Sequence, residues 1–210
     1  MTGDTAKLRR QEALRDLRRE QILHAALTVF ATEGLERATM RAIAAKAGCT
    51  TGAIYPLFGS KEAIYAALLS QSLEALDAHV ARAMAAAGAG WAGLEAGLRA
   101  FAGYYVGRPA EVALGLYLSG GIGRRGLSKD LDRDLNARLA RVLGRIEQAL
   151  SAVAPEVDAR GQAAALFSFL VGALLVHYTG RLDSLQRPLE AVIDSHLALL
   201  RAALGEGPAA

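Results

Sequence analysis

The segment around residue 50 carries small side chains, hydroxyl groups and a glycine in succession. Thr50, Thr51, Gly52 and Ala53 leave the backbone accessible to a close partner. Backbone amides and small hydroxyls at the start of a helix bind phosphate oxygens, and a Thr methyl or an Ala can contact the methyl group of thymine. These residue types point to contact with double-stranded DNA.

Four residues near this segment are suited to hold the phosphate backbone. Tyr55 offers a phenol, and Thr39 and Arg41 lie at the start of the preceding helical segment. Lys61 follows Ser60, which we expect to cap the next helix, so the lysine charge opposes the dipole of that helix. A phosphate that completes the site would explain this position, and a solvent-facing lysine is the alternative.

The charge of the chain is small but concentrated. The 210 residues carry 24 Lys and Arg against 21 Asp and Glu, a formal net charge of +3. Such an excess is too small for a polycationic protein that packages nucleic acid. Residues 1–70 hold ten basic and seven acidic side chains, and the remainder is neutral. A basic module followed by a neutral one indicates an anionic partner at one end, although so small an excess also fits chance.

Residues suited to catalysis or metal binding are scattered. Cys49 is the only cysteine, which excludes an internal disulfide and a cysteine-rich metal site. The four histidines fall in separate predicted helices, without the spacing that would let two of them bind one metal. We therefore expect no catalytic residue, no metal and no cofactor, and a protein that is not an enzyme. For Cys49 we expect packing as a small apolar side chain, with redox sensing as the alternative.

The elements that would position these residues are helical. Ala, Leu, Arg and Glu dominate, only five prolines interrupt, and apolar residues recur four apart, as in Ile22, Ala26 and Phe30. Glycine and proline divide the chain into the predicted helices 16–32, 40–47, 51–56, 61–87, 91–106, 110–119, 129–152, 158–179 and 188–204. The predicted fold class is all-α.

The first three of these helices form a recognisable motif. Gly34 suits a left-handed C-cap, Thr39 the N-cap of the second helix, and Thr50 the N-cap of the third. Gly48 lies in the tight turn between the second and third helices. Two short helices joined in this way predict a helix-turn-helix, whose second helix enters the DNA major groove.

The stretch from Arg18 to Leu69 resembles the DNA-binding domain of the tetracycline-repressor (TetR) family. The matching residues are Ile22, Leu23, His24, Ala25, Ala26, Phe30, Gly34, Thr39, Ile43, Ala44, Ala47, Gly48, Gly52, Ile54, Tyr55, Phe58, Ser60, Lys61 and Glu62. The resemblance implies a dimeric repressor whose C-terminal domain binds a small molecule and then releases DNA. The sequence departs from the family at Leu57, where His or Tyr often contacts phosphate. It also carries Pro56, which should end or distort the third helix.

This resemblance and the apolar pattern organise the whole chain. We expect an N-terminal extension at 1–15, a DNA-binding domain at 16–62 linked through helix 61–87, a ligand-binding and dimerisation domain at 63–205, and a tail at 206–210. Helices 158–179 and 188–204 are predicted to form a four-helix interface between two copies. The arginines before the motif predict a helical extension with an auxiliary role on DNA; they are Arg9, Arg10, Arg15, Arg18 and Arg19.

Aromatic and apolar residues in the later helices predict a pocket for a small molecule. The candidates for contact with it are Phe101, Tyr104, Tyr105, Tyr117, Phe167, Val171, Leu174 and His177. Acidic residues are absent from the middle of these apolar segments, which favours a neutral or weakly anionic lipophilic ligand over a cation. For any one of these side chains, packing in the core is the alternative.

Two other functions compete with DNA binding. Residues Gly121–Gly126 match the GxGxxG pattern of a dinucleotide-binding enzyme, with Glu147 about 20 residues further on, but no parallel strands accompany it. Residues 163–178 are apolar enough to suggest a membrane-associated helical bundle, yet the run is shorter than a typical span. The N-terminus lacks the apolar core of a signal peptide, so we expect a cytoplasmic protein.

Overall fold

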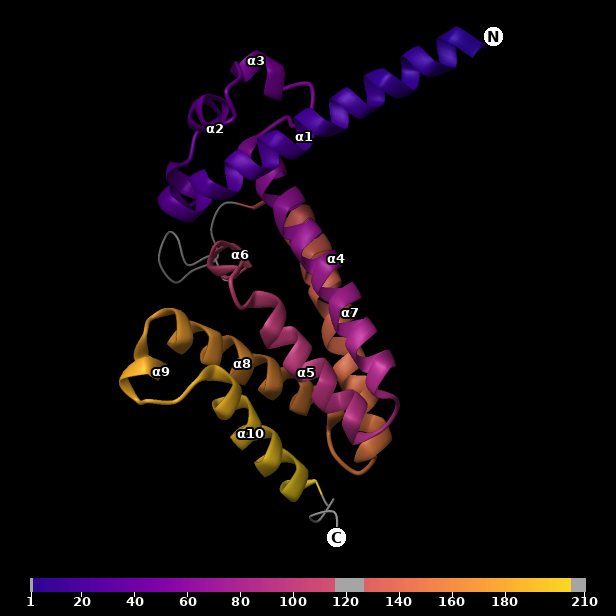
Figure 1. The fold of residues 1–210 in the computed structure, drawn as a ribbon, viewed down its shortest axis with the longest axis vertical. Helices are drawn as coiled ribbons and strands as arrows, with labels where there is room; N and C mark the ends of the chain where they lie inside the picture. The colour runs from indigo at the N-terminus through magenta and orange to yellow at the C-terminus, as the bar shows by residue number, and fades with distance from the viewer. Residues whose placement is uncertain (1, 116–126, 205–210) are drawn as a thin grey trace. The chain divides into compact units, whose positions relative to one another are not determined.

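The computed structural model describes residues 2–115 and 127–204. These residues are almost entirely helical and contain no β-strand, which confirms the all-α fold class (Figure 1). The chain divides into two compact units. The first comprises Met1–Ser72 and Ala110–Leu135, and the second Leu73–Pro109 and Asn136–Ala210. The predicted DNA-binding domain, residues 16–62, therefore lies within the first unit, which also takes residues from later in the chain.

Packing in the first unit follows the helical spacing of its apolar residues. Its elements are α1 (Thr2–Arg37), α2 (Met40–Lys46), α3 (Thr51–Ile54), α6 (Pro109–Gly115), and the beginnings of α4 (Lys61–Ala87) and α7 (Lys129–Val153). Its most buried large side chains include Ile22, Phe30, Ile43, Ile54 and Ile64. The ring of Phe30 meets the ring of Tyr65 edge-on, with centroids 5.2 Å apart. The residues that predict the first helices thus also form the core that holds α1, α2 and the start of α4 together.

Helix α1 is longer than predicted. The predicted range of 16–32 becomes Thr2–Arg37, because the residues of the extension continue the helix. Leu8, Leu14 and Leu17 are more than half exposed, so this extension owes little to core burial and rests on good helix formers. The predicted interruption is present: Gly34 has φ 76° and ψ 166°, outside the helical region, and a short final turn follows it.

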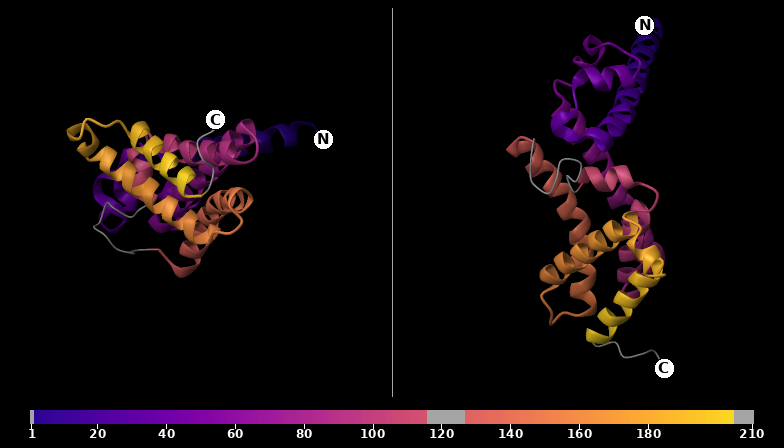
Figure 2. Two further views of the ribbon diagram at one scale, coloured as in Figure 1. Left: turned by 90° about the horizontal axis from the view of Figure 1, so that it is seen from below. Right: turned by 90° about the vertical axis from the view of Figure 1, so that its left-hand side faces the viewer.

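The second unit is a bundle built around α8. It contains α5 (Trp91–Tyr105), α8 (Ala159–Tyr178), α9 (Arg181–Ser184), α10 (Leu189–Ala203), and the later parts of α4 and α7. Helix α8 packs against α5 and α10, and the views of Figures 1 and 2 agree in drawing α8 beside α10. The core of the unit contains Leu94, Leu98, Phe101, Val142, Ile146, Leu150, Leu166, Leu174 and Leu197.

The predicted helices of the second half agree with the structure to within a few residues, except at α9. This four-residue helix was not predicted; it begins after Gly180, whose φ is 71°, and no side chain caps its first turn. Its one buried residue is Leu182. Because packing rather than a local signal supports α9, the sequence pattern does not reveal it. The end of the predicted helix 110–119 lies outside the described residues.

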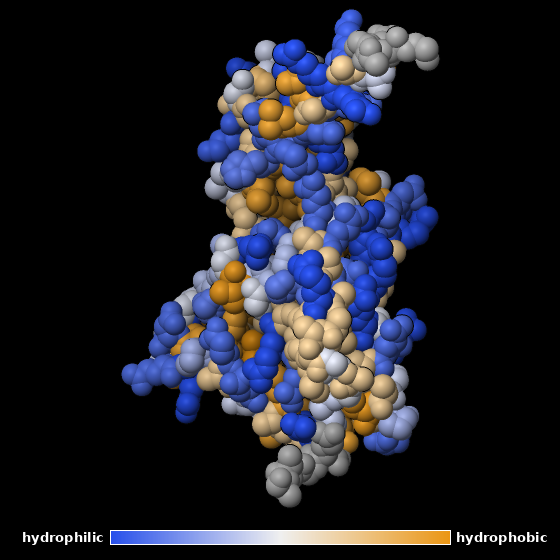
Figure 3. Space-filling view, turned by 45° about the vertical axis from the view of Figure 1, so that its right-hand side comes forward, coloured by the Kyte–Doolittle hydropathy of each residue, from blue (hydrophilic) through white to orange (hydrophobic). Residues whose placement is uncertain are grey.

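Helix α8 is the one described helix that is long and apolar enough to cross a membrane by length and composition. The core helix of a soluble bundle has the same properties. One face of α8, with Ala163, Leu166, Leu170 and Leu174, is buried within the second unit. Leu175, on another face, is only half-buried. The surface drawn in Figure 3 mixes hydrophilic and hydrophobic residues among those that the structure describes.

Candidate nucleic-acid interface

The N-terminal end of α2 is organised by Thr39. Its backbone is extended, and its Oγ1 accepts a hydrogen bond from the amide of Ala42 at 3.0 Å. This is the N-cap predicted from the sequence. Ile43 and Ala44 face the core, whereas Arg41 is exposed. The helix therefore presents a polar side to solvent while its apolar side fixes it to the first unit.

A tight turn connects α2 to α3. Gly48 has φ 67°, the left-handed conformation that the turn requires, and the amide of Cys49 donates to the carbonyl of Ala44 at 3.0 Å. Cys49 itself is half-buried. Thr50 occupies the N-cap position of α3, but its hydroxyl makes no capping hydrogen bond. The predicted helix-turn-helix is thus present, with an exposed hydroxyl at the start of its second helix.

Helix α3 is a single turn and ends early. The predicted range of 51–56 shortens to Thr51–Ile54, followed by a turn through Tyr55, Pro56 and Leu57. Proline has no amide to continue the helical hydrogen bonds, and the next amides, of Leu57 and Phe58, both donate to Ile54. The expectation that Pro56 ends the helix is confirmed.

The side chains predicted to face DNA are largely accessible. Thr39, Arg41, Thr50 and Gly52 are exposed, and Tyr55 keeps 54% of its surface exposed although it is a large aromatic residue. Thr51 and Ala53 are half-buried. These residues come from α2 and α3, which pack on each other. A surface of hydroxyls, one guanidinium, one phenol and little bulk can approach a nucleic-acid groove closely.

Lys61 differs from the other candidates because its charge has partners within the chain. Its Nζ donates to the backbone carbonyls of Glu36 at 2.8 Å and Ala38 at 2.9 Å. The ammonium therefore has partners within the chain as well as exposure to solvent, and its contact with a phosphate stays a prediction. Ser60 does cap α4, since its Oγ accepts from the amide of Ala63 at 3.2 Å.

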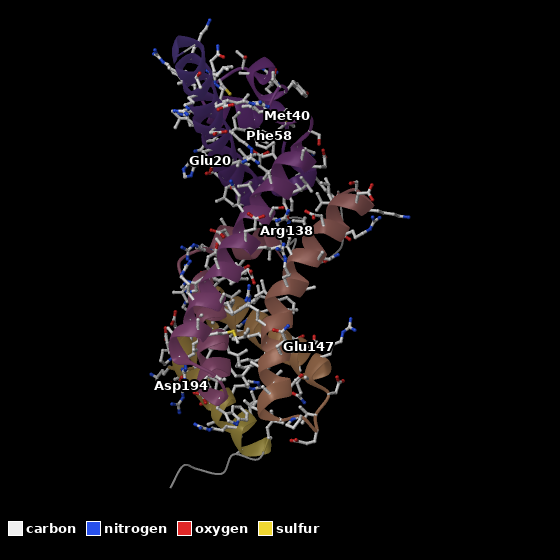
Figure 4. The ribbon with its side chains drawn as sticks, turned by 90° about the vertical axis from the view of Figure 1, so that its right-hand side faces the viewer. Glu20, Met40, Phe58, Arg138, Glu147 and Asp194 are labelled. Carbon is white, nitrogen blue, oxygen red and sulfur yellow. The ribbon has the colours of Figure 1, made fainter. Side chains whose placement is uncertain are left out.

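One of the arginines that precede the motif, Arg19, also packs inward. The guanidinium of Arg19 lies 5.2 Å from the ring centroid of the buried Phe58. Beside it, Oε1 of Glu20 is 3.5 Å from Arg19 and accepts from Gln71 at 3.0 Å; Figure 4 labels Glu20 and Phe58. The auxiliary role on DNA that the sequence predicts for these arginines stays a prediction, and in the folded chain Arg19 covers part of the core through this cation–π contact. The other arginines of that group, Arg9, Arg10, Arg15 and Arg18, are exposed.

The predicted ligand-contacting residues come together in part in the second unit. Phe101, Tyr104, Tyr105 and Leu174 are buried, and Phe167, Val171 and His177 are half-buried. The ring centroids of Phe101 and Phe167 are 6.0 Å apart, and those of Tyr104 and Tyr105 are 5.1 Å apart. Tyr117 lies outside the described residues, as does the motif at Gly121–Gly126. The structure therefore shows an aromatic cluster between α5 and α8 without assigning it a ligand.

Two polar residues at the edge of this cluster were not among the candidates. The hydroxyl of Tyr178 donates to the carbonyl of Tyr105 and accepts from the amide of Arg108 at 3.2 Å. The guanidinium of Arg108 lies 4.5 Å from the ring centroid of Tyr104 and donates to the carbonyl of that residue. The two bonds of Tyr178 join the end of α5 to α8. Their partners are about 70 residues apart in sequence, so no local pattern signals them.

Within residues 2–115 and 127–204, no group of His, Cys, Asp and Glu is arranged to hold a metal. Those ranges also lack the parallel strands that a dinucleotide-binding enzyme needs. The enzyme and membrane alternatives find no support in the fold. What the geometry offers is an exposed helix-turn-helix on one unit and an aromatic core in the other.

Comparison with known proteins identifies the first of these elements. Residues 22–68 match the family model of bacterial regulatory proteins, tetR family. A comparison with curated proteins finds no match. Among similar solved structures is the fatty acid degradation regulator FadR from Bacillus halodurans, which is 20% identical with a TM-score of 0.69; the match covers 91% of this chain and 97% of that one.

Two further solved structures are similar over most of their length. The transcriptional regulator FadR from Bacillus subtilis, in complex with stearoyl-CoA, is 21% identical with a TM-score of 0.70, over 86% of this chain and 96% of that one. The TetR family regulator PfmR from Thermus thermophilus is 21% identical with a TM-score of 0.69, over 91% of this chain and 98% of that one. At such identities the similarity shows a shared fold.

Proposed function

We propose that the chain, whose residues 22–68 match the family model of bacterial regulatory proteins, tetR family, is a homodimeric repressor of a near-palindromic operator. A small lipophilic molecule releases the repressor from DNA. The role is regulatory rather than catalytic, and it requires the cytoplasm, where operator DNA is accessible. The observation that supports DNA binding most directly is the exposed opening of α3, with the hydroxyl of Thr50 outside any capping bond and Gly52 beside it.

In this proposal α3 reads bases and its neighbours hold the backbone. Thr50, Thr51, Gly52 and Ala53 approach base edges in the major groove, where small side chains allow close contact. Thr39, Arg41 and Tyr55 bind phosphates and fix the register without reading sequence. The exposed arginines of the α1 extension add sequence-independent attraction to the DNA.

The dimer is proposed to form through α8 and α10. Apolar side chains remain accessible on both helices within one chain: Leu175 is half-buried, and Leu199 keeps 70% of its surface exposed. Pairing these helices with their copies gives a four-helix interface with two-fold symmetry. Such a dimer presents two α3 helices to half-sites about 34–36 Å apart, or a multiple of that spacing.

The effector is proposed to bind among the aromatic residues of the second unit. We propose that the buried rings of Phe101, Tyr104 and Tyr105 contact its apolar part, and that the half-buried Phe167 and His177 also contact it. An acyl chain suits such contacts, and a structurally similar regulator was solved with stearoyl-CoA. Release of DNA then requires that the effector bind the DNA-incompetent state more tightly than the DNA-bound one.

An in vitro operator selection with the full chain tests DNA binding. The selected duplexes should contain two related half-sites, and affinity should fall steeply as salt rises, because phosphate contacts release counterions. Recovery of random duplexes with salt-insensitive binding would contradict the proposal. A screen of fatty acids, acyl thioesters and lipophilic cations for release of the selected duplex then tests the effector. Release by cations alone would contradict the lipophilic, non-cationic class.

A further inference from the structure

Lys61 joins the start of α4 to the end of α1. Its ammonium donates to the carbonyls of Glu36 at 2.8 Å and Ala38 at 2.9 Å. These acceptors precede it by 25 and 23 residues, so both bonds are tertiary contacts and not a local cap. The side chain is half-buried. We call this pair of bonds the Lys61 clamp.

The clamp resolves the electrostatic conflict that the sequence shows at this position. A positive charge in the first turn of α4 opposes the dipole of that helix. The final carbonyls of a helix carry the opposite partial charge and lack intrahelical partners. The ammonium of Lys61 lies against such carbonyls at the end of α1, where Arg37 also donates to the carbonyl of Glu33 at 3.0 Å. The lysine charge is thus compensated inside the protein, and no phosphate is needed to explain it.

The clamp holds the connection that sets where α2 begins. Ala38, one of its two acceptors, directly precedes Thr39, the N-cap of α2. The side chain of Ala38 is buried, and its amide donates to the carbonyl of Gly34 at 3.1 Å. Both the amide and the carbonyl of Ala38 are therefore hydrogen-bonded, which fixes its backbone. A shift of this residue would move Thr39 and the exposed side of α2 with it.

We propose that Lys61 is a positioning residue for DNA binding, an inference that rests on the proposed function. Its ammonium fixes the α1–α2 connection and thereby the orientation of α2 and α3 toward the groove. Two of its three ammonium donors are committed to these carbonyls, so the proposed role of Lys61 is to hold this connection, and a phosphate contact through the third donor is the alternative that the test must exclude. Loss of the clamp should then harm specific recognition more than general attraction to DNA.

Full-length wild-type protein and three variants test this. Lys61→Gln removes the clamp and one charge, Lys61→Arg keeps charged donors, and Lys129→Gln is the matched control because Lys129 is exposed at the start of α7. Each protein is titrated with an operator obtained by selection and with a scrambled duplex of equal length, over a range of salt concentrations. Amide hydrogen exchange is followed at residues 38–44 without DNA.

We expect Lys61→Gln to bind the operator at least about tenfold more weakly, since charged hydrogen bonds contribute on this scale. Its affinity for the scrambled duplex and its salt dependence should match Lys129→Gln, and its α2 amides should exchange faster. Lys61→Arg should recover part of the operator affinity and of the protection. If Lys61→Gln does not fold, Lys61→Arg provides the test. Its ratio of operator affinity to scrambled-duplex affinity should be lower than that of wild type, and its amides at residues 38–44 should exchange faster.

Three results would overturn the proposal. If the slope of log affinity against log salt concentration is smaller by about 0.9 in Lys61→Gln, with amide exchange unchanged, Lys61 contacts a phosphate instead. Equal weakening on both duplexes at an unchanged slope means a general loss of folded protein. If amide exchange at residues 38–44 is the same in Lys61→Gln as in wild type, the clamp does not hold the α1–α2 connection, and the proposal fails whatever the DNA result. If wild type selects no operator, the proposed function fails separately, and the exchange measurement still tests the clamp.

Discussion

Arg145 donates to both carboxylate oxygens of Asp77, with Nε–Oδ1 at 2.7 Å and Nη2–Oδ2 at 2.9 Å. The pair links α7 to α4 within the second unit. Arg138, labelled in Figure 4, also donates to α4, at Glu74, which lies about one helical turn before Asp77. A planar guanidinium matches a carboxylate in this two-bond geometry, which an ammonium group cannot reproduce. The hydrogen bonds from Arg145 lower the pKa of Asp77 below its ordinary value of 3.8, against the opposing effect of burial.

Acid should weaken the second unit through Asp77. Because its pKa is lowered on folding, the pair stabilises the folded state above pH 3.8, and this contribution is lost as pH falls through the lowered pKa. Asp77→Asn should reduce the free energy of unfolding at neutral pH by about 0.5–1 kcal/mol, as the pair is partly exposed. Urea unfolding at neutral and acid pH checks this. An undiminished acid dependence in the variant would show that other carboxylates cause it.

Gly52→Ala should impair DNA binding without harming the fold. A Cβ at this position would meet only Oγ1 of Thr50, at 3.8 Å, so the protein has room for it. The methyl group would instead occupy space between α3 and the groove, and we expect operator affinity to fall at least about tenfold. Mobility-shift titration and thermal unfolding measure the two effects. Gly144→Ala, on α7 with nothing within 4 Å, is the control, and equal affinity for both variants would contradict a close approach at Gly52.

Gly93→Ala should destabilise the second unit strongly. A Cβ there would lie 2.2 Å from the carbonyl oxygen of Gly88, which is backbone and cannot rotate away. We expect a loss of about 2–3 kcal/mol in the free energy of unfolding, typical of an overpacked site. Gly103→Ala, on the same helix with open space around it, should be neutral or slightly stabilising. Chemical denaturation measures the free energy of unfolding of both variants. Similar values would mean that the backbone between α4 and α5, at Gly88, shifts to accommodate the added methyl group.

Protonation of His196 should disfavour folding. This half-buried imidazole stacks on the ring of Phe169 at 3.8 Å between centroids, and desolvation lowers its pKa below 6.5. The unfolded chain therefore binds the proton more tightly, so stability is complete above pH 6.5 and declines as the pH falls below that value. His196→Phe keeps an aromatic stack without a titrating group and should flatten this part of the pH profile. Thermal unfolding from slightly alkaline to mildly acidic pH tests this, and an unchanged profile would assign the dependence to another group.

Much of the first unit follows from local signals in the chain. Gly34 interrupts α1 because its backbone leaves the helical region, Thr39 caps α2 with its own hydroxyl, and Pro56 ends α3 because it has no amide. Each signal acts within about four residues, the reach of helical hydrogen bonds and caps. This is why the helix-turn-helix and the residues it exposes could be predicted without coordinates.

The partners of long side chains could not be predicted in this way. The sequence shows a lysine at the start of α4, but packing brings the end of α1 to it and turns an expected phosphate ligand toward two carbonyls. The same holds for Arg19 on Phe58 and for Tyr178 between Tyr105 and Arg108. Local backbone chemistry sets where a helix begins and ends. The charged tip of a flexible side chain, however, takes whichever acceptor or ring the folded chain brings within reach, and that depends on contacts between distant residues.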